Sequence, residues 1–256
     1  MMRWYLIKRL FLIAISILSW SLTGFAQYPF ECKPAINLKK FDKWQILKHS
    51  DEKLDYTIVI PDFFPNHDPI KVKIIGGSGR DSCDVHIYKK NTLIKSFIEP
   101  IQISSFGPRP QSAFLEDVNG DGLKDLKILI PNNGCCGAYN FYAQVMYFFQ
   151  NKNSTLTEIS FQDLLWNYEN RPERDFDGDG NFEIITQTFQ NYGAHNYLLY
   201  NLYNFNGKTL ANVNKKANYP IMIQLLWEEN YKITNKISRA KMKTFTRKQP
   251  DDYSQK

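Results

Sequence analysis

Short runs of apolar residues alternate with polar residues along most of the chain, and turn-forming residues separate these runs. Between Ile70 and Ile75 the apolar positions alternate imperfectly with Lys71 and Lys73, which is typical of a strand with one solvated face. Proline and glycine bound many of the runs, as expected for connections between strands. These criteria predict eight strands, over residues 56–60, 70–75, 85–88, 93–98, 126–130, 142–149, 184–189 and 198–205.

One segment has a helical signature. Ser160-Phe-Gln-Asp163 resembles a capping box and precedes Leu164, Leu165 and Trp166, which predicts a helix of about two turns. The predicted fold class is therefore all-β, with antiparallel sheets and one short helix. Propeller-like blades and a compact two-sheet domain both agree with this pattern.

The chain contains an internal repeat. Residues 117–125 (DVNGDGLKD) recur at 175–183 (DFDGDGNFE), offset by 58 residues. Each copy precedes a predicted strand, then a small Gly-Ala loop and an aromatic-rich strand, so the repeats extend over 117–150 and 175–207. The second repeat ends at Asn206-Gly207, a sequence typical of a two-residue hairpin turn. Matching features in the same order indicate a duplicated structural unit.

Both repeats begin with a pattern suited to calcium. Calcium takes six to eight oxygen ligands, and a D-x-[DN]-x-D-G loop supplies carboxylates at alternate positions while glycine permits the sharp turn. Two calcium sites are therefore expected, against the simpler interpretation that the loops are solvated acidic turns. The expected ligands, with the backbone carbonyl at the seventh position, are Asp117, Asn119, Asp121, Leu123 and Asp125, and Asp175, Asp177, Asp179, Asn181 and Glu183.

The spacing separates these loops from other calcium motifs. An EF-hand requires an acidic residue at position 12, where this chain has Ile128 and Thr186. Position 9 is acidic instead, and each loop leads directly into a predicted strand. In this respect the chain resembles the FG-GAP/VCBS family of extracellular calcium-binding repeats. The resemblance covers about residues 117–210 and implies calcium loops that connect β-strands, commonly within a propeller.

The N-terminus has the features of an export signal. A positive segment with Arg3, Lys8 and Arg9 precedes the apolar run 10–18, and small residues lead to Ala26. We expect residues 1–26 to be a signal peptide cleaved after Ala26, which implies a periplasmic or secreted protein without a stable membrane span. An uncleaved anchor is the alternative interpretation.

The remaining chain divides by composition. Residues 27–53 are expected to be an irregular lead-in, 54–235 the β domain, and 236–256 a basic, poorly ordered C-terminal tail. The formal net charge of +6 includes three positive residues of the signal and a strongly basic C-terminus. Nucleic acid is not an expected partner of an exported chain without the signature of a nucleic-acid-binding fold, although the basic tail offers attraction to an anionic surface. An aromatic content of 15% excludes intrinsic disorder.

Four cysteines in an exported chain favour disulfides over zinc, because neither a CxxC nor a suitable histidine spacing is present. Adjacent cysteines rarely pair, so two connectivities remain for Cys32, Cys83, Cys135 and Cys136. The first pairs Cys32 with Cys135 and Cys83 with Cys136, and the second pairs Cys32 with Cys136 and Cys83 with Cys135.

No catalytic motif stands out. The four histidines lack metal-binding spacing, and Ser78 lacks the surroundings of a nucleophile elbow. We therefore expect a non-catalytic protein that binds a cell-envelope or extracellular partner, either a protein or a glycan. Its contacts are expected from loops and exposed aromatic residues such as Tyr139, Tyr142, Tyr192 and Tyr197.

Two alternatives have different implications. The Ser78-Gly79-Arg80-Asp81 segment is similar to the Ser-Gly loop of periplasmic inhibitors of peptidoglycan hydrolases, although Ser82 stands where a tyrosine is expected. That resemblance implies a loop inserted into an enzyme cleft. The other alternative is a hydrolase with a carboxylate pair that the sequence does not identify.

Overall fold

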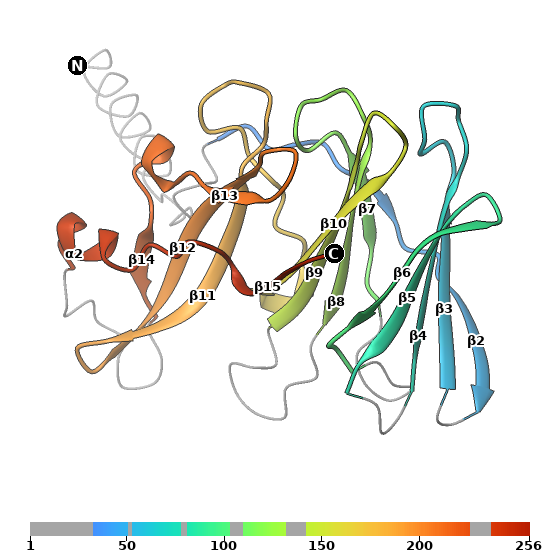
Figure 1. Ribbon diagram of the computed structural model, residues 1–256. Helices are drawn as coiled ribbons and strands as arrows, with labels where there is room; N and C mark the ends of the chain where they lie inside the picture. Colours follow the sequence, from blue (N-terminus) through green and yellow to red (C-terminus); the bar gives the residue numbers. More distant parts are fainter. Residues whose placement is uncertain (1–32, 51–52, 78–80, 103–109, 132–141, 226–236) are drawn as a thin grey trace, which may run out of the picture. The chain divides into compact units, whose positions relative to one another are not determined.

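The alternating segments form antiparallel strands in the computed structural model, which describes residues 33–50, 53–77, 81–102, 110–131, 142–225 and 237–256. The strands lie in three open sheets, and the described part of the chain contains one short α-helix (Figure 1). The predicted all-β class with antiparallel sheets and one short helix is confirmed, although the helix lies at Arg239–Lys243 and not at the predicted position. Each of the eight predicted strand segments lies within an observed strand.

The five-stranded sheet is a meander in which consecutive strands are neighbours. Its alternation follows the sequence pattern: Ile70, Val72 and Ile74 are buried, whereas Lys71 and Lys73 are partly exposed. The side chains therefore separate the two faces of the sheet as a period of two requires. Its strands are β2 (Gln45–Ser50), β3 (Lys53–Ile60), β4 (Ile70–Gly76), β5 (Cys83–Lys89) and β6 (Thr92–Glu99).

The six-stranded sheet has the order β1-β7-β8-β9-β10-β15. Its edge strands are distant in sequence, since β1 pairs with β7 through Phe41 and Ala113, and β15 pairs with β10 through Gln255 and Ile159. The strands are β1 (Lys39–Phe41), β7 (Ala113–Glu116), β8 (Asp125–Pro131), β9 (Tyr142–Gln150), β10 (Leu156–Leu164) and β15 (Asp251–Gln255).

The four-stranded sheet is built around β12, which pairs with three other strands. Its hairpin turn lies at Asn206-Gly207 as predicted, but the loop has four residues, 206–209, because Phe205 pairs with Leu210. Gly207 has a φ of +85°, which glycine adopts without steric cost. The strands are β11 (Ile184–Tyr192), β12 (His195–Phe205), β13 (Leu210–Asn212) and β14 (Ile221–Gln224).

Both faces of the six-stranded sheet are buried. One apolar cluster joins Ile58 and Val72 of the five-stranded sheet to Ile128 and Phe148. A second cluster joins Phe149, on the opposite face, to Phe205 of the four-stranded sheet. All seven residues of β8 are buried, including Asp125 and Lys127, so this strand shows little of the alternation seen in β4.

The helix prediction at 160–166 is wrong. Residues 156–164 form β10, and only a 3₁₀ turn, η2 (Trp166–Tyr168), follows. The capping-box pattern is local, whereas β10 gains a full ladder with β9 on one side and pairs with β15 on the other. Tertiary pairing therefore overrides the local signal.

Two other expectations differ from the structure. The lead-in contains β1 and β2, so it is not irregular throughout. The basic tail is structured from residue 237 onward: Ser238 caps helix α2 (Arg239–Lys243), and β15 follows. The tail is anchored because Lys256 contacts the buried carboxylate of Glu99 at 2.6 Å. No helix in the described ranges is long and apolar enough to cross a membrane.

Candidate metal centre

The two acidic loops contact each other. The first loop, 117–125, connects β7 to β8, and the second, 175–183, leads into β11. The Phe182 N–H donates to the Val118 carbonyl at 2.9 Å. A Cβ added to Gly120 would lie 2.6 Å from the Gly180 carbonyl oxygen, so this contact requires a residue without a side chain. The repeated loops therefore form a single unit at the N-terminal ends of β8 and β11, which belong to different sheets.

The first position of each loop has the same structural role. The Asp117 carboxylate accepts hydrogen bonds from the N–H groups of Asp121 and Gly122, at 3.1 and 2.7 Å. The Asp175 carboxylate accepts from Gly178 and Gly180, at 2.6 and 3.3 Å. In each loop the carboxylate at position 1 therefore closes the turn by satisfying backbone donors.

The fifth positions and the glycines also match. Asp121 Oδ1 accepts from the Leu123 N–H at 2.8 Å, and Asp179 Oδ1 accepts from the Asn181 N–H at 2.9 Å. The backbone hydrogen bond from Asn181 lowers the pKa of Asp179. The glycines at positions 4 and 6 have positive φ in both loops, between +72° and +82°. The sequence repeat thus corresponds to a repeated backbone conformation.

The ninth positions differ. Both carboxylates accept from the N–H of the second loop residue, Val118 to Asp125 at 3.0 Å and Phe176 to Glu183 at 2.8 Å. The other Asp125 oxygen accepts from the Gln150 N–H at 3.1 Å. The corresponding oxygen of the fully buried Glu183, Oε1, has no donor at hydrogen-bond distance among the described residues, although the side chains of Asn204 and Lys216 lie near this carboxylate. Desolvation raises the pKa of both carboxyl groups.

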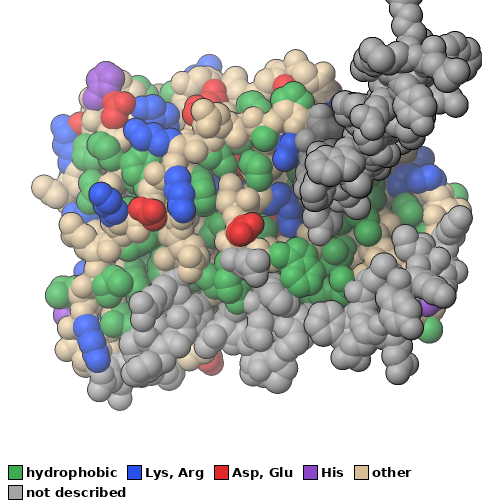
Figure 2. Space-filling view, turned by 180° about the vertical axis from the view of Figure 1, so that it is seen from behind, with side chains coloured by type: hydrophobic (Ala, Val, Ile, Leu, Met, Phe, Trp, Pro, Cys, Tyr) green, Lys and Arg blue, Asp and Glu red, His purple; other side chains and the backbone are tan. Residues whose placement is uncertain are grey.

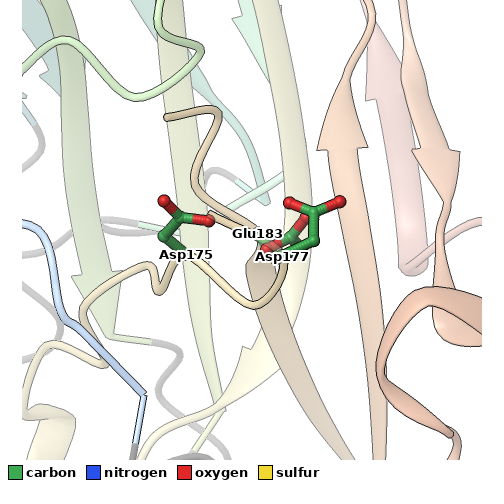
Figure 3. A group of neighbouring side chains, drawn as sticks. All are labelled: Asp175, Asp177 and Glu183. Atoms are coloured by element: carbon green, nitrogen blue, oxygen red, sulfur yellow. The ribbon is translucent and has the colours of Figure 1, made fainter. Parts of the chain in front are cut away.

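In the second loop, three carboxylates converge. Ligand oxygens of Asp175, Asp177 and Glu183 all lie within 4.8 Å of one another. Figure 3 shows Asp177 and Glu183 next to each other, with Asp175 across the loop. Glu183 is buried and Asp177 is at the surface, so the group extends from the interior to the solvent. Within the described ranges, no other three His, Cys, Asp or Glu side chains converge in this way.

In the first loop, the expected ligands lie close together along the turn but are engaged with each other and with the backbone. The Asn119 amide donates to Asp121 Oδ2 at 3.1 Å, while both oxygens of Asp117 and of Asp125 accept backbone hydrogen bonds. Lys124, also in this loop, donates to Asp62 Oδ2 at 2.7 Å, which connects the loop to the turn after β3.

A lysine from outside the second loop, which the sequence does not indicate, contacts the carboxylates of that loop. Lys216 lies in a 3₁₀ helix, η3 (Asn214–Ala217). Its Nζ is 2.6 Å from Asp177 Oδ2, 3.2 Å from Asp179 Oδ2 and 3.6 Å from Glu183 Oε1. Hydrogen bonding to Asp177 raises the pKa of Lys216, so the side chain is positively charged at neutral pH. Because Lys216 follows the loop by more than 30 residues, no local motif signals this contact.

The other predicted site residues are only partly described. Cys83 is buried at the start of β5. Tyr142 and Tyr192 are partly buried, but Tyr197 is 1% exposed. The expectation that Tyr197 contacts a partner at the surface is therefore wrong, because its ring lies in the core of the four-stranded sheet. Outside the described residues lie Cys32, Cys135, Cys136, Tyr139 and residues 78–80 of the Ser78–Asp81 segment that is similar to hydrolase inhibitors.

The donor set defines the chemistry of this centre. The converged groups are carboxylates without sulfur or imidazole ligands, which suits a hard cation such as calcium better than zinc or copper. Magnesium requires a more regular octahedron and retains several waters. Comparisons with protein-family models, with curated proteins and with solved structures found no match for this chain.

Proposed function

We propose that this chain is an exported, calcium-stabilised binding protein without a catalytic centre, and that the second acidic loop is its principal calcium site. The observation that carries the proposal is the fully buried Glu183 carboxylate. One of its oxygens accepts a hydrogen bond from the Phe176 N–H, while Oε1 has no hydrogen-bond donor and lies 3.6 Å from the Lys216 ammonium group. The same carboxylate converges with those of Asp175 and Asp177. A buried carboxylate oxygen without a donor is costly, and a bound cation would offset that cost.

The surrounding residues suit a divalent ion. Asp175, Asp177, Asp179 and Glu183 place four negative charges in nine residues, and calcium binding would relieve their mutual repulsion. The Asn181 backbone carbonyl, at the seventh position, is an additional proposed ligand. Position 1 is engaged in the same way in both loops, but at position 9 Asp125 has both oxygens engaged by backbone N–H groups, whereas Glu183 has only one so engaged. We therefore propose that the first loop binds calcium more weakly, through Asp117, Asn119, Asp121, the Leu123 carbonyl and Asp125.

Calcium in the second loop would stabilise more than the loop itself. Glu183 directly precedes β11, and Phe182 donates to Val118 of the first loop. A cation that fixes residues 175–183 would therefore strengthen the connection between the four-stranded and six-stranded sheets. At a calcium concentration about ten times the dissociation constant, binding adds about 1.4 kcal/mol to the free energy of unfolding.

The proposed partner is a protein or glycan of the cell envelope or the extracellular space. The export signal expected at residues 1–26 supports this location. Figure 2 shows hydrophobic side chains at the surface among lysine and arginine side chains on one face of the molecule. Several large aliphatic side chains of the five-stranded sheet are exposed: Ile46, Leu47, Val59, Leu93, Ile94 and Ile98.

Thermal melting with and without calcium tests the calcium proposal. We expect 1 mM calcium to raise the melting temperature of the wild-type protein by about 3–6 °C relative to EDTA. The double variant D175N/D177N removes two converged carboxylates at nearly constant side-chain volume and should lose most of this response. Identical melting of the wild-type protein in calcium and in EDTA would contradict the proposal.

A further inference from the structure

Lys216 makes an unusual set of contacts with the second acidic loop. Its ammonium group contacts the carboxylates at positions 3, 5 and 9, which are Asp177, Asp179 and Glu183. We propose that Lys216 is a tethered counter-ion that occupies the second-loop site when calcium is absent and is displaced when calcium binds. This inference rests on the proposed function and concerns the regulation of that same site.

The geometry makes the two cations mutually exclusive. An ammonium group has three donors, and here three carboxylate oxygens surround it at 2.6, 3.2 and 3.6 Å. Calcium would need the same carboxylates at about 2.3–2.6 Å. A divalent ion at that position would overlap the ammonium nitrogen and repel its charge. Lys216 therefore has to leave before calcium reaches its full coordination.

The backbone of Lys216 is fixed, but its side chain has room to leave. The neighbouring Asn214 is buried, and its side chain binds the Leu202 N–H at 2.8 Å and the Asn201 side chain at 2.9 Å. These contacts fix η3 against β12. The Lys216 side chain is 33% exposed, so rotation about its side-chain bonds can carry the ammonium group into solvent without unfolding η3.

In the described part of the chain, no lysine pairs with the carboxylates of the first loop in this way. Its own lysine, Lys124, forms an ion pair with Asp62 outside the loop. No lysine or arginine of the described residues forms an ion pair with Asp117, Asp121 or Asp125. The tethered cation is thus specific to the loop in which three carboxylates converge. It would keep that loop folded without calcium and would shift calcium binding to higher concentrations.

Calorimetric titration of the full chain with calcium tests the affinity. K216M should tighten calcium binding at one site by about tenfold, because calcium no longer has to displace an ammonium group from its ion pairs with Asp177, Asp179 and Glu183. K215M is the matched control, since Lys215 is an exposed lysine of the same 3₁₀ helix. The calcium affinity of K215M should equal that of the wild type. Equal affinity of K216M and wild type would overturn the tethered counter-ion.

Amine labelling of the wild-type protein tests the displacement without a variant that has to fold. We expect Lys216 to react slowly with an N-hydroxysuccinimide ester in EDTA and several-fold faster in saturating calcium, as measured by peptide mass spectrometry, while Lys215 labels equally in both. Unchanged labelling of Lys216 despite calorimetric calcium binding would overturn the displacement but leave the calcium site intact. Absence of calcium binding to both wild type and K216M would overturn the calcium proposal, and this inference with it.

Discussion

The first and second acidic loops share a backbone conformation but differ in what their carboxylates bind. In both loops the first aspartate closes the turn, the fifth caps a backbone N–H, and two glycines have positive φ. At the ninth position, Asp125 has both oxygens engaged by backbone N–H groups, whereas Glu183 Oε1 has no hydrogen-bond donor. A repeated turn therefore does not by itself produce a repeated cation site.

The side chain at position 9 accounts for much of this difference. Both residues accept a hydrogen bond from the second loop position, but β8 lies inside the six-stranded sheet, so the N–H of Gln150 on β9 is close to Asp125. Glutamate has one more methylene group, and the Glu183 carboxylate converges with those of Asp175 and Asp177. The first loop is thus mainly a hydrogen-bonded structural turn, whereas the second has several converged carboxylates whose negative charge Lys216 balances only in part.

The largest expected effect on stability is at the ninth loop position, where replacing Asp125 should cost more than replacing Glu183. In D125A the N–H groups of Val118 and Gln150 lose their acceptor, and each buried, unpaired donor costs about 1–3 kcal/mol. We expect D125A to lower the free energy of unfolding in EDTA by about 3–5 kcal/mol. E183A leaves one backbone N–H, that of Phe176, without its acceptor and should lower it by about half as much. Urea unfolding measures both values. An equal or larger loss in E183A would break the proposed distinction between the loops.

A smaller effect tests the contact between the loops. Gly120 has a φ of +72°, and a Cβ there would lie 2.6 Å from the Gly180 carbonyl oxygen. Gly178 has a φ of +79°, but a Cβ there meets nothing within 4 Å, so G178A is the matched control for backbone strain. We expect G178A to cost about 1 kcal/mol and G120A about 2–3 kcal/mol, measured by urea unfolding. Equal costs would show that the loop contact contributes little.

The smallest expected effect concerns the lysine of the first loop. A hydrogen bond from Lys124, with a further contribution from His67, lowers the pKa of Asp62 to about 2. A lowered pKa means that the pair stabilises the folded protein above pH 4 and that this contribution is lost as the pH falls through 2. Both side chains are exposed, so K124M should hardly change stability at pH 7.

Nuclear magnetic resonance titration of the Asp62 carboxyl group gives the sharper readout for this pair. Its pKa should rise in K124M toward the ordinary value near 4 and should stay near 2 in K215M. A pKa that is the same in K124M and in the wild type would mean that Lys124 does not connect the first loop to Asp62.

The sequence predicts most of the fold because burial is periodic. Strands such as β4 have one face in the core and one face in contact with solvent, and their alternation is visible without tertiary information. The helix predicted at 160–166 shows the limit of local signals. Ile159 and Phe161 face one side of β10 and Glu158 and Ser160 the other, but a cap-like tetrapeptide obscured this period of two.

The candidate site is predictable only in part, for a similar reason. The loop motif identifies Asp175, Asp177 and Glu183, because calcium ligands in such a loop are close in sequence. The contacts that make the loops unequal come from Gln150 and Lys216, each more than 20 residues from its loop partner. Tertiary pairing determines these contacts, so the two loops look equivalent in sequence and differ in structure.

Calorimetric titration of calcium into the wild type, D177N and D121N tests the central claim most directly. Asp177 and Asp121 are loop positions 3 and 5, and each amide replaces one expected ligand carboxylate at nearly constant volume. We predict that the tighter binding event of the wild type is lost in D177N and retained in D121N. A D177N titration identical to that of the wild type, or loss of the tighter event in D121N instead, would contradict the assignment of the principal calcium site to the second loop.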